Sequence, residues 1–485
     1  MRIRSVRTRS FVRFVLAIIT GFVAAPAHSE DWPQFRGPNA SGIAAESTDP
    51  PVTFSTTENV RWSVPLGPGV ACPVITAGRV FATQMSEDGQ FVVSAYGADS
   101  GEELWSTKFD TGPLPEITPP NEHASSTPAS DGERVYVHFS TLGMLALNAE
   151  TGSPVWEQKL PQPFYLMGWG AANSPIVCED MVIFNLDDDL APYLIAFDKV
   201  TGDVRWKTDR PEMLGGYAVP VLCTANGRTD VVVAGTGKMQ GYDPHTGEEL
   251  WTCNSLLRTI MTTPVVQDDA IYFSVQSYGD TSRVLKYALL QWNDTNQDGQ
   301  LGKDEVDPAF HAKFDAGDAD EDGFLNEDEI DVAFQSPNNR VGGGNIVQAI
   351  RGGGTGDVTE SHMIWSLDHK APSNICSPLA FDGRLLLVKK GGISAAFNLA
   401  DGEEIWDRKR IGNFGNYYAS PIAAGDRIYV PGENGYITVL KAGPAVDVLS
   451  KNDVGNSTIA TPAIADNRLY VRTYDKLWCF EEPGQ

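Results

Sequence analysis

A small residue followed by proline recurs eight times along this chain, and this repeat constrains the fold more than any other feature. The pairs are Cys72-Pro73, Thr127-Pro128, Ser174-Pro175, Val219-Pro220, Thr263-Pro264, Ser377-Pro378, Ser420-Pro421 and Thr461-Pro462. Most intervals between these prolines run from 41 to 47 residues, which is enough for four short antiparallel strands. Units of this kind arranged radially form a propeller. We therefore predict an all-β fold, an eight-bladed β-propeller with one blade for each proline.

A second repeated signal marks the later part of each unit, where a glycine lies four residues before a tryptophan. The pairs are Gly101 and Trp105, Gly152 and Trp156, Gly202 and Trp206, Gly247 and Trp251, and Gly402 and Trp406. The glycine suits the positive φ of a hairpin turn, and the tryptophan is expected to pack against the neighbouring unit. Trp62 and Trp365 mark two more units, and Val448-Leu449 takes the place of the tryptophan in the eighth.

The two ends of the repeat region predict a closed ring. The strand-like segment Val60–Val64 precedes the first proline, and the last unit stops at Leu477–Phe480. Together these segments would complete one blade, and closure would remove the exposed sheet edges of an open array. A flat solenoid is the open alternative.

The interval between Pro264 and Pro378 is 114 residues long, which predicts an insertion in the fifth blade. The insertion contains two tandem matches to the twelve-residue calcium loop of EF hands, so we expect a small α-helical EF-hand pair and two calcium ions. The predicted ligands are Asp294, Asn296, Asp298, Gln300 and Glu305 in the first loop and Asp318, Asp320, Asp322, Phe324, Asn326 and Glu329 in the second, with backbone carbonyls contributed by Gln300 and Phe324.

The composition of the two loops supports a cation site. Calcium takes six to eight oxygen ligands, and Gly299 and Gly323 permit the sharp central turn. Leu301 and Leu325 are expected to pair in a short ladder between the loops. From Asp294 to Glu329 thirteen acids face two lysines, so this segment repels itself without a cation, and we expect calcium to order it. Whether calcium is structural or regulatory is left open.

The N-terminal residues predict export. Five arginines and no acidic residue precede an apolar run from Phe14 to Ala25. This pattern is typical of a signal peptide, which we expect to be cleaved after Ser29. We expect a periplasmic or secreted protein with no membrane insertion after cleavage. The formal net charge of −26 disfavours nucleic acid as a partner. The expected organisation is a signal peptide at 1–29, an N-terminal segment at 30–56, a propeller at 57–282, an EF-hand pair at 283–335 and the rest of the propeller at 336–482.

The pattern Ala-x-Asp-x-x-Thr-Gly-x-x-x-Trp, read from Ala196 to Trp206, resembles the repeat of pyrroloquinoline-quinone propellers. That superfamily includes quinoprotein alcohol dehydrogenases and the BamB subunit of outer-membrane protein assembly. The opening Asp31–Pro38 is similar to the start of secreted bacterial proteins labelled quinoprotein-like. For a dehydrogenase the resemblance implies a quinone held between a tryptophan and a vicinal disulfide, with calcium on its carbonyl and an aspartate as base. The six cysteines of this chain include no adjacent pair, and we expect them to be core residues.

Function in propellers usually lies at one mouth of the channel, so the residues just before the repeated prolines are candidates for binding. For a cofactor we single out Glu122, His123, Trp169 and Asn173, because the first two could serve as base or metal ligand and a tryptophan can stack on a planar ring. The other candidates are Tyr217, Arg258, Asn374, Asn416 and Tyr417.

Three functions are consistent with these observations. The preferred one is a calcium-binding module or scaffold with a protein or polymer partner. The first alternative is a quinone-dependent alcohol or polyvinyl-alcohol dehydrogenase with pyrroloquinoline quinone as cofactor. The second is assembly of outer-membrane proteins. No hydrolase or nucleotide motif is present, so the sequence favours a binding protein over an enzyme and identifies no catalytic residue.

Overall fold

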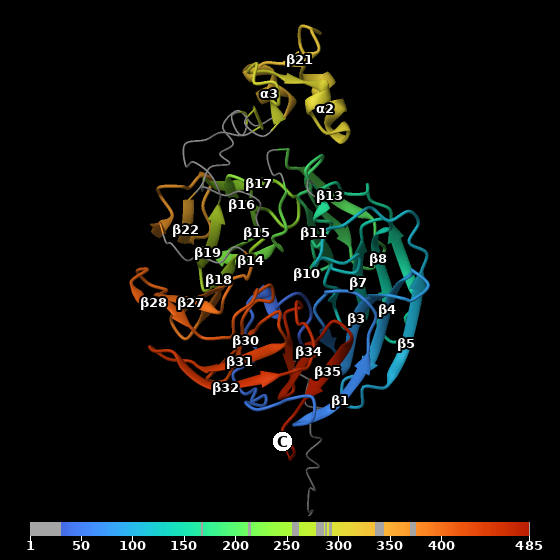
Figure 1. The fold of residues 1–485 in the computed structure, drawn as a ribbon, viewed down its shortest axis with the longest axis vertical. Helices are drawn as coiled ribbons and strands as arrows, with labels where there is room; N and C mark the ends of the chain where they lie inside the picture. Colours follow the sequence, from blue (N-terminus) through green and yellow to red (C-terminus); the bar gives the residue numbers. More distant parts are fainter. Residues whose placement is uncertain are drawn as a thin grey trace, which may run out of the picture.

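Eight small antiparallel sheets form a ring in the computed structural model (Figure 1), and the predicted eight-bladed all-β propeller is confirmed. The structure describes residues 31–165, 168–211, 215–254, 261–277, 286, 289–290, 293–334, 344–368 and 375–484. The expected signal peptide lies outside these residues. Within this part of the chain, no helix has the length and apolar character needed to cross a bilayer.

The first four blades follow one another along the chain, each running from its innermost to its outermost strand. They comprise β2 (Val74–Thr76), β3 (Arg79–Met85), β4 (Phe91–Gly97) and β5 (Glu103–Phe109); β6 (Ala129–Ser130), β7 (Arg134–Phe139), β8 (Gly143–Asn148) and β9 (Pro154–Gln158); β10 (Ile176–Cys178), β11 (Met181–Leu186), β12 (Tyr193–Asp198) and β13 (Val204–Asp209); and β14 (Val221–Ala225), β15 (Arg228–Gly235), β16 (Lys238–Tyr242) and β17 (Glu249–Asn254). A fifth strand, β23 (Gly356–Asp357), extends the fourth blade by pairing in parallel with β17.

The remaining blades complete the ring. They comprise β18 (Val265–Gln267), β19 (Ala270–Ser277), β22 (Gly344–Arg351) and β24 (Met363–Asp368); β25 (Leu379–Phe381), β26 (Arg384–Lys389), β27 (Ile393–Asn398) and β28 (Glu404–Arg410); β29 (Ile422–Ala424), β30 (Arg427–Pro431), β31 (Tyr436–Lys441) and β32 (Asp447–Asp453); and β33 (Ala463–Ala465), β34 (Arg468–Arg472), β35 (Lys476–Phe480) and β1 (Val60–Pro65). The last blade joins both ends of the repeat region, because Trp62 of β1 pairs with Cys479 of β35. The predicted closure is therefore confirmed.

Packing of tryptophan on glycine connects most neighbouring blades. A Cβ atom on Gly247 would lie 2.4 Å from the Trp206 ring, so only glycine leaves room for the indole of the preceding blade. The Trp206 indole N–H also donates to the Pro244 carbonyl at 2.8 Å. The same packing occurs between Trp62 and Gly101, Trp105 and Gly152, Trp156 and Gly202, and Trp365 and Gly402.

Two tryptophans depart from this rule, because their indole N–H groups donate within their own blades. Trp251 lies over Gly241 and donates to Asp230 Oδ2 at 2.8 Å. Trp406 donates to Ser394 Oγ at 3.2 Å. In the blades that follow them the short glycine turn is missing, because the fifth blade has the longer segment 352–362 at this position and the seventh has the segment 442–446.

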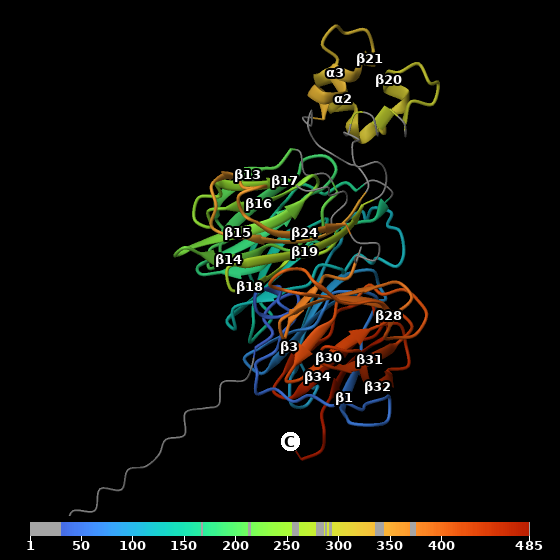
Figure 2. The same ribbon diagram turned by 90° about the vertical axis from the view of Figure 1, so that its left-hand side faces the viewer.

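Between β19 and β22 the chain leaves the fifth blade and forms a small unit beyond the rim of the ring (Figures 1 and 2). Its elements are β20 (Leu301–Gly302), the 3-10 turns η3 (Lys303–Glu305) and η4 (Pro308–Phe310), α2 (His311–Gly317), β21 (Phe324–Leu325) and α3 (Glu327–Ala333). Of the first ten residues of the predicted EF-hand pair, 283–292, the structure describes 286, 289 and 290. The unit has an apolar core of its own, which includes Phe310, Phe314 and Ile330.

Candidate functional site

In the first acidic loop, carboxylate side chains accept hydrogen bonds from backbone N–H groups of the same loop. The carboxylate of Asp294 accepts the Gly299 N–H at 2.9 Å, and Gly299 has a φ of 84°. At the end of the loop, Glu305 accepts the Thr295 N–H at 2.8 Å and the Gly302 N–H at 2.9 Å. The backbone N–H of Gly302 and the hydroxyl of Thr295 lower the pKa of Glu305, so this carboxylate is favoured in the charged form that a cation needs.

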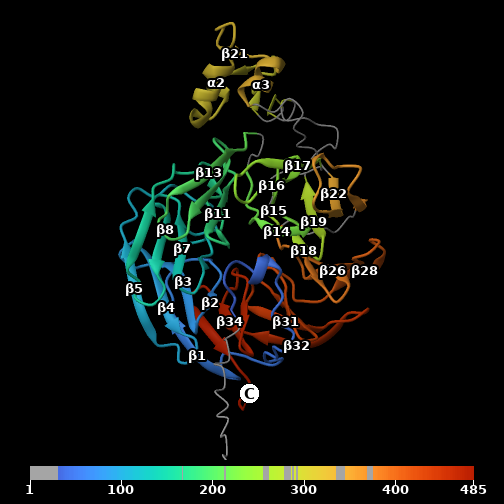
Figure 3. The ribbon, with the colours of Figure 1, turned by 180° about the vertical axis from the view of Figure 1, so that it is seen from behind.

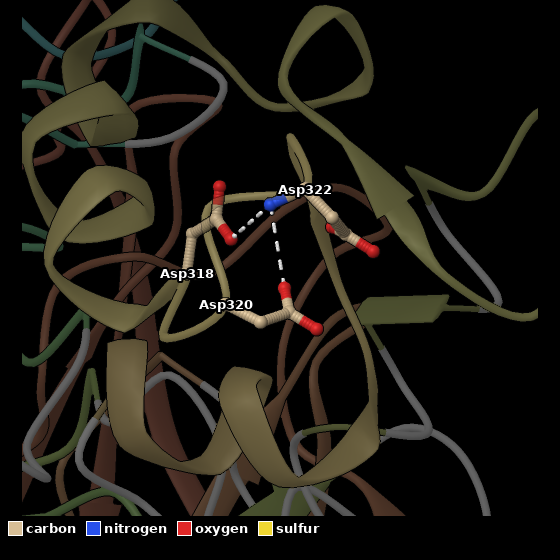
Figure 4. Close-up of side chains that lie close together, drawn as sticks. All are labelled: Asp318, Asp320 and Asp322. Atoms are coloured by element: carbon tan, nitrogen blue, oxygen red, sulfur yellow. Dashed lines mark hydrogen bonds between the residues drawn. The ribbon is translucent and has the colours of Figure 1, made fainter.

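The second acidic loop brings three carboxylates together (Figure 4). Oxygens of Asp318, Asp320 and Asp322 lie within 4.8 Å of one another. The Asp322 N–H donates to Asp318 at 3.1 Å and to Asp320 at 3.3 Å, which orients both side chains toward the loop centre. Glu329 is held by the Asn326 N–H at 3.0 Å, and this bond lowers its pKa. The donor set consists of hard oxygens, which suit a calcium ion.

The two loops are joined by a short ladder. Leu301 pairs with Leu325 in register, and both side chains are fully buried. The pairing predicted from the sequence is thus present, and it places the two loops side by side. A change in one loop would therefore act on the other through this ladder.

The inserted unit contacts the third blade, although it is inserted between two strands of the fifth blade. Phe310 packs edge-on against Phe164, with ring centroids 5.7 Å apart. Phe164 precedes the third blade and donates its N–H to Asp188 at 3.1 Å. Burial lowers the pKa of Lys313 in the unit, while the carboxylates of Asp188 and Asp189 oppose this shift. No sequence signal pointed to this contact, because it joins two loops far apart in the chain.

A cavity of about 410 Å³ lies inside the ring, and all eight blades contribute to its wall. One layer of the wall consists of the eight residues that precede the repeated prolines. The residues two positions earlier form a second layer, because alternate residues of extended backbone face the same side. This second layer consists of Val70, Ser125, Ala172, Tyr217, Met261, Ile375, Tyr418 and Ile459.

Hydrogen bonds run from blade to blade around the first layer. The Thr127 hydroxyl accepts the Cys72 N–H at 3.0 Å, and the Ser174 hydroxyl accepts the Thr127 N–H at 2.9 Å. Four more bonds of 2.9–3.1 Å continue this pattern at Thr263, Ser377, Ser420 and Thr461. The recurring Ser/Thr-Pro pair thus has a structural cause. The hydroxyl satisfies a buried N–H near the crowded axis, and the proline adds no further donor.

The N-terminal segment crosses the middle of the ring (Figure 3), at one end of this cavity, which its residue Phe35 helps to line. Trp32 pairs with Ile75 of the first blade, and Ala44 donates to Ala423 of the seventh at 2.9 Å. Between them, the buried Arg36 donates to the Pro378 carbonyl at 2.7 Å. The intervening residues include Phe35, whose side chain forms part of the cavity lining. Residues 32–44 therefore act as a plug that belongs to the propeller.

The structure separates the predicted channel residues into groups. Trp169 and Tyr217 line the axial cavity. Asn173 is fully buried, accepts from Tyr165 at 2.6 Å and donates to the Gly216 carbonyl at 3.0 Å, so it supports the wall without lining it.

Glu122 and His123 line a neighbouring cavity of about 310 Å³, to which Asp307 of the inserted unit also contributes. Burial raises the pKa of Glu122 and lowers the pKa of His123, so it shifts both side chains toward their neutral forms. Glu122 and His123 thus line a different cavity from Trp169, and the three residues do not form one binding site.

At the sixth-to-seventh blade junction, Tyr417 points into the core and donates to the Asn413 carbonyl, whereas Tyr418 lines the cavity. Asn416 donates to Glu433 at 2.7 Å. The sequence-based prediction missed Tyr418, Met261 and Ile375. Each lies two residues before a residue of the first layer, and this position was the available signal. Arg258 and Asn374 lie outside the described residues.

All six cysteines are buried, and none forms a disulfide, in agreement with their predicted role in the core. A vicinal disulfide is thus absent from the cavity. The described lining also contains no charged side chain. The buried guanidinium groups of Arg36 and Arg472 donate to the backbone carbonyls of Pro378 and Thr83 and are not part of the lining. The described residues therefore do not fit pyrroloquinoline quinone, which is a tricarboxylate.

The closed ring of eight blades with the Trp-Gly repeat defines a β-propeller of the pyrroloquinoline-quinone-like class. The profile of the family described as outer membrane protein assembly factor BamB matches residues 52–167, 88–307 and 341–481. These matches cover more than half of the chain, so it belongs to this family. No curated protein matches the chain.

Solved structures share the fold at low sequence identity. BamB from Moraxella catarrhalis is 16% identical with a TM-score of 0.53, and the match covers 88% of this chain and 98% of that one. Quinohemoprotein alcohol dehydrogenase from Comamonas testosteroni is 13% identical with a TM-score of 0.54, covering 94% and 82%. The computationally designed protein Ika8 is 10% identical with a TM-score of 0.53, covering 87% and 100%. These similarities concern the fold alone.

Proposed function

We propose that this chain is an exported calcium-binding propeller that serves as a binding module or scaffold for a protein or polymer partner. The observation that carries the proposal is the pair of twelve-residue loops whose backbones meet at Leu301 and Leu325, with three carboxylates brought together in the second loop. Each loop holds one calcium ion, and together they form an EF-hand pair inserted in the fifth blade.

The ions have a structural role in this proposal. The many acids of the insertion repel one another, and two divalent cations offset much of that repulsion. The ordered unit then presents its surface beside the third blade, where Phe310 meets Phe164. Residues 1–29 act as the signal peptide, which places the mature protein in the periplasm or outside the cell.

Calorimetry and metal analysis on the mature protein test the calcium sites. We expect two bound calcium ions in the wild type and loss of binding in a Glu305→Gln, Glu329→Gln double variant. The matched control is Asp304→Asn, Asp328→Asn, which removes the same charge from the neighbouring non-ligand position of each loop. Retention of both ions in the glutamine variant, or equal loss in the control, would show that the loops do not bind calcium as proposed.

Membership of the family favours assembly of outer-membrane proteins as a second function. In that case the propeller would co-purify with the outer-membrane assembly complex after mild cross-linking. The quinone-dependent alternative has less support, because the residues described around the axial cavity offer neither a disulfide nor a positive charge for that cofactor.

A further inference from the structure

We propose that the axial cavity is a binding site for a small, flat, uncharged aromatic molecule. Its volume of about 410 Å³ lies within the range of small-molecule sites, which is about 300–1,000 Å³. The plug closes one end, where Phe35 lines the floor. The cavity is therefore a pocket with a defined shape and not an open channel through the ring.

The shape of the wall favours a flat ligand. Five of the eight positions in the second layer carry a large side chain, and they come from the fourth to the eighth blade. On the opposite side the second layer has the smaller side chains of Val70, Ser125 and Ala172, and the segment 118–121 and Trp169 also line the cavity there. Asn121 donates to the Trp169 carbonyl, which ties these two segments together. Aromatic rings at Trp169, Tyr217 and Tyr418 can stack on a planar molecule or meet its edge.

The chemistry of the wall favours an uncharged ligand, whose polar edge can meet the hydroxyl groups of the first layer. None of the described lining residues carries a charge, and a charged molecule would lose its hydration here without compensation. The hydroxyl layer supplies the polar groups. Each Ser or Thr of that layer accepts a backbone N–H and still has a proton to donate. Among the described residues, the Ser174 hydroxyl donates to the Ala172 carbonyl at a long distance of 3.4 Å.

A matched pair of fluorescent probes tests this proposal on the mature full-length protein. N-phenyl-1-naphthylamine is uncharged, and 1-anilinonaphthalene-8-sulfonate has the same aromatic framework with a sulfonate added. We expect saturable binding of one uncharged probe per chain. The sulfonate must be desolvated to enter, so we expect its affinity to be lower by at least about tenfold.

Two variants that fill the cavity locate the binding. Ala172→Phe and Val70→Phe each place a ring in the second layer, and we expect either to weaken the uncharged probe by at least about tenfold. Val200→Phe is the control, because Val200 lies on an exposed turn of the third blade. Circular dichroism and thermal unfolding establish that each variant is folded. If one variant fails to fold, the other still decides the outcome.

Three results would overturn the proposal: binding that does not saturate, equal affinity for the two probes, or unchanged binding in a folded variant with a filled cavity. The test is independent of the calcium loops. The Glu305→Gln, Glu329→Gln protein should bind the uncharged probe like the wild type, so failure of the metal sites and failure of the cavity site can be told apart.

Discussion

Replacing Asp187 by asparagine should destabilise the propeller more than any other removal of a single charge that we consider. Asp187 and Arg210 connect the third blade to the start of the fourth, and their side chains are 0% and 1% exposed. Two bonds of 2.8 and 2.9 Å join the carboxylate to the guanidinium in a bidentate pair. The guanidinium also donates to Gln240 at 2.9 Å. This network supports the backbone at Gly216, next to the cavity residue Tyr217.

The expected magnitude follows from burial. Asparagine preserves the shape of the side chain but leaves the Arg210 charge without compensation, and breaking a buried pair in this way costs about 3–5 kcal/mol. Asp209→Asn is the matched control, because the Lys207–Asp209 pair has a similar distance of 2.7 Å but side chains that are 45% and 78% exposed. An exposed pair contributes about 0–1 kcal/mol.

Urea unfolding followed by tryptophan fluorescence measures both variants. The free energy of unfolding should fall by about 3–5 kcal/mol in Asp187→Asn and by less than about 1 kcal/mol in Asp209→Asn. A further variant, Asp187→Leu with Arg210→Met, removes both charges and should lose less stability than the single change. Equal and small losses in the two asparagine variants would refute the argument that burial sets the cost.

Three further predictions concern packing, pH and the inserted unit. Gly247→Ala should lower the free energy of unfolding by about 2 kcal/mol or more, because the new methyl clashes with the Trp206 indole. Gly227→Ala is the control, because Gly227 has a similar φ of 78° with open space around it, and only about 1 kcal/mol of backbone strain is expected in the same urea assay. Burial lowers the pKa of His138 to about 3, so the wild type should lose up to about 1.4 kcal/mol per pH unit as the pH falls from about 6.5 toward 3. In His138→Gln this contribution should disappear, and an unchanged pH dependence would contradict it. Phe310→Ala should speed hydrogen exchange around Phe164 and leave the thermal unfolding of the ring unchanged; no change in exchange would show that the contact does not hold the unit.

The repeat predicted the ring because most blades place the same residue types at the same points. The Ser/Thr hydroxyls before the prolines accept buried N–H groups near the axis, and the glycine turns accept a tryptophan from the preceding blade. The rule fails where the next blade lacks the turn. Trp251 and Trp406 could not be assigned correctly from their own repeats, since their environment depends on the neighbouring sequence.

The site was predicted in part. The spacing of acids predicted two twelve-residue loops, and the structure brings Asp318, Asp320 and Asp322 of the second together, because these residues are local in sequence. Calcium binding by the loops stays a prediction. The axial cavity depends on contributions from eight distant segments, and only alternation along extended backbone shows which residue of each segment faces inward. Tyr418 therefore lines the cavity, while its neighbour Tyr417 does not. The plug and the contact of Phe310 with the third blade depend on tertiary packing alone.

The closure of the last blade has a consequence for how this chain is made. Val60 pairs with Phe480, so a strand synthesised early must wait for one that emerges near the end of translation. Until then β1 and the incomplete last blade each expose an unpaired edge, which favours association between chains. A protein crossing a membrane as an unfolded chain would meet this delay on the far side. If the chain is exported as proposed, we expect it to depend on a holding chaperone until β35 has arrived. We expect chains truncated before Lys476 to exchange strands and form dimers or aggregates.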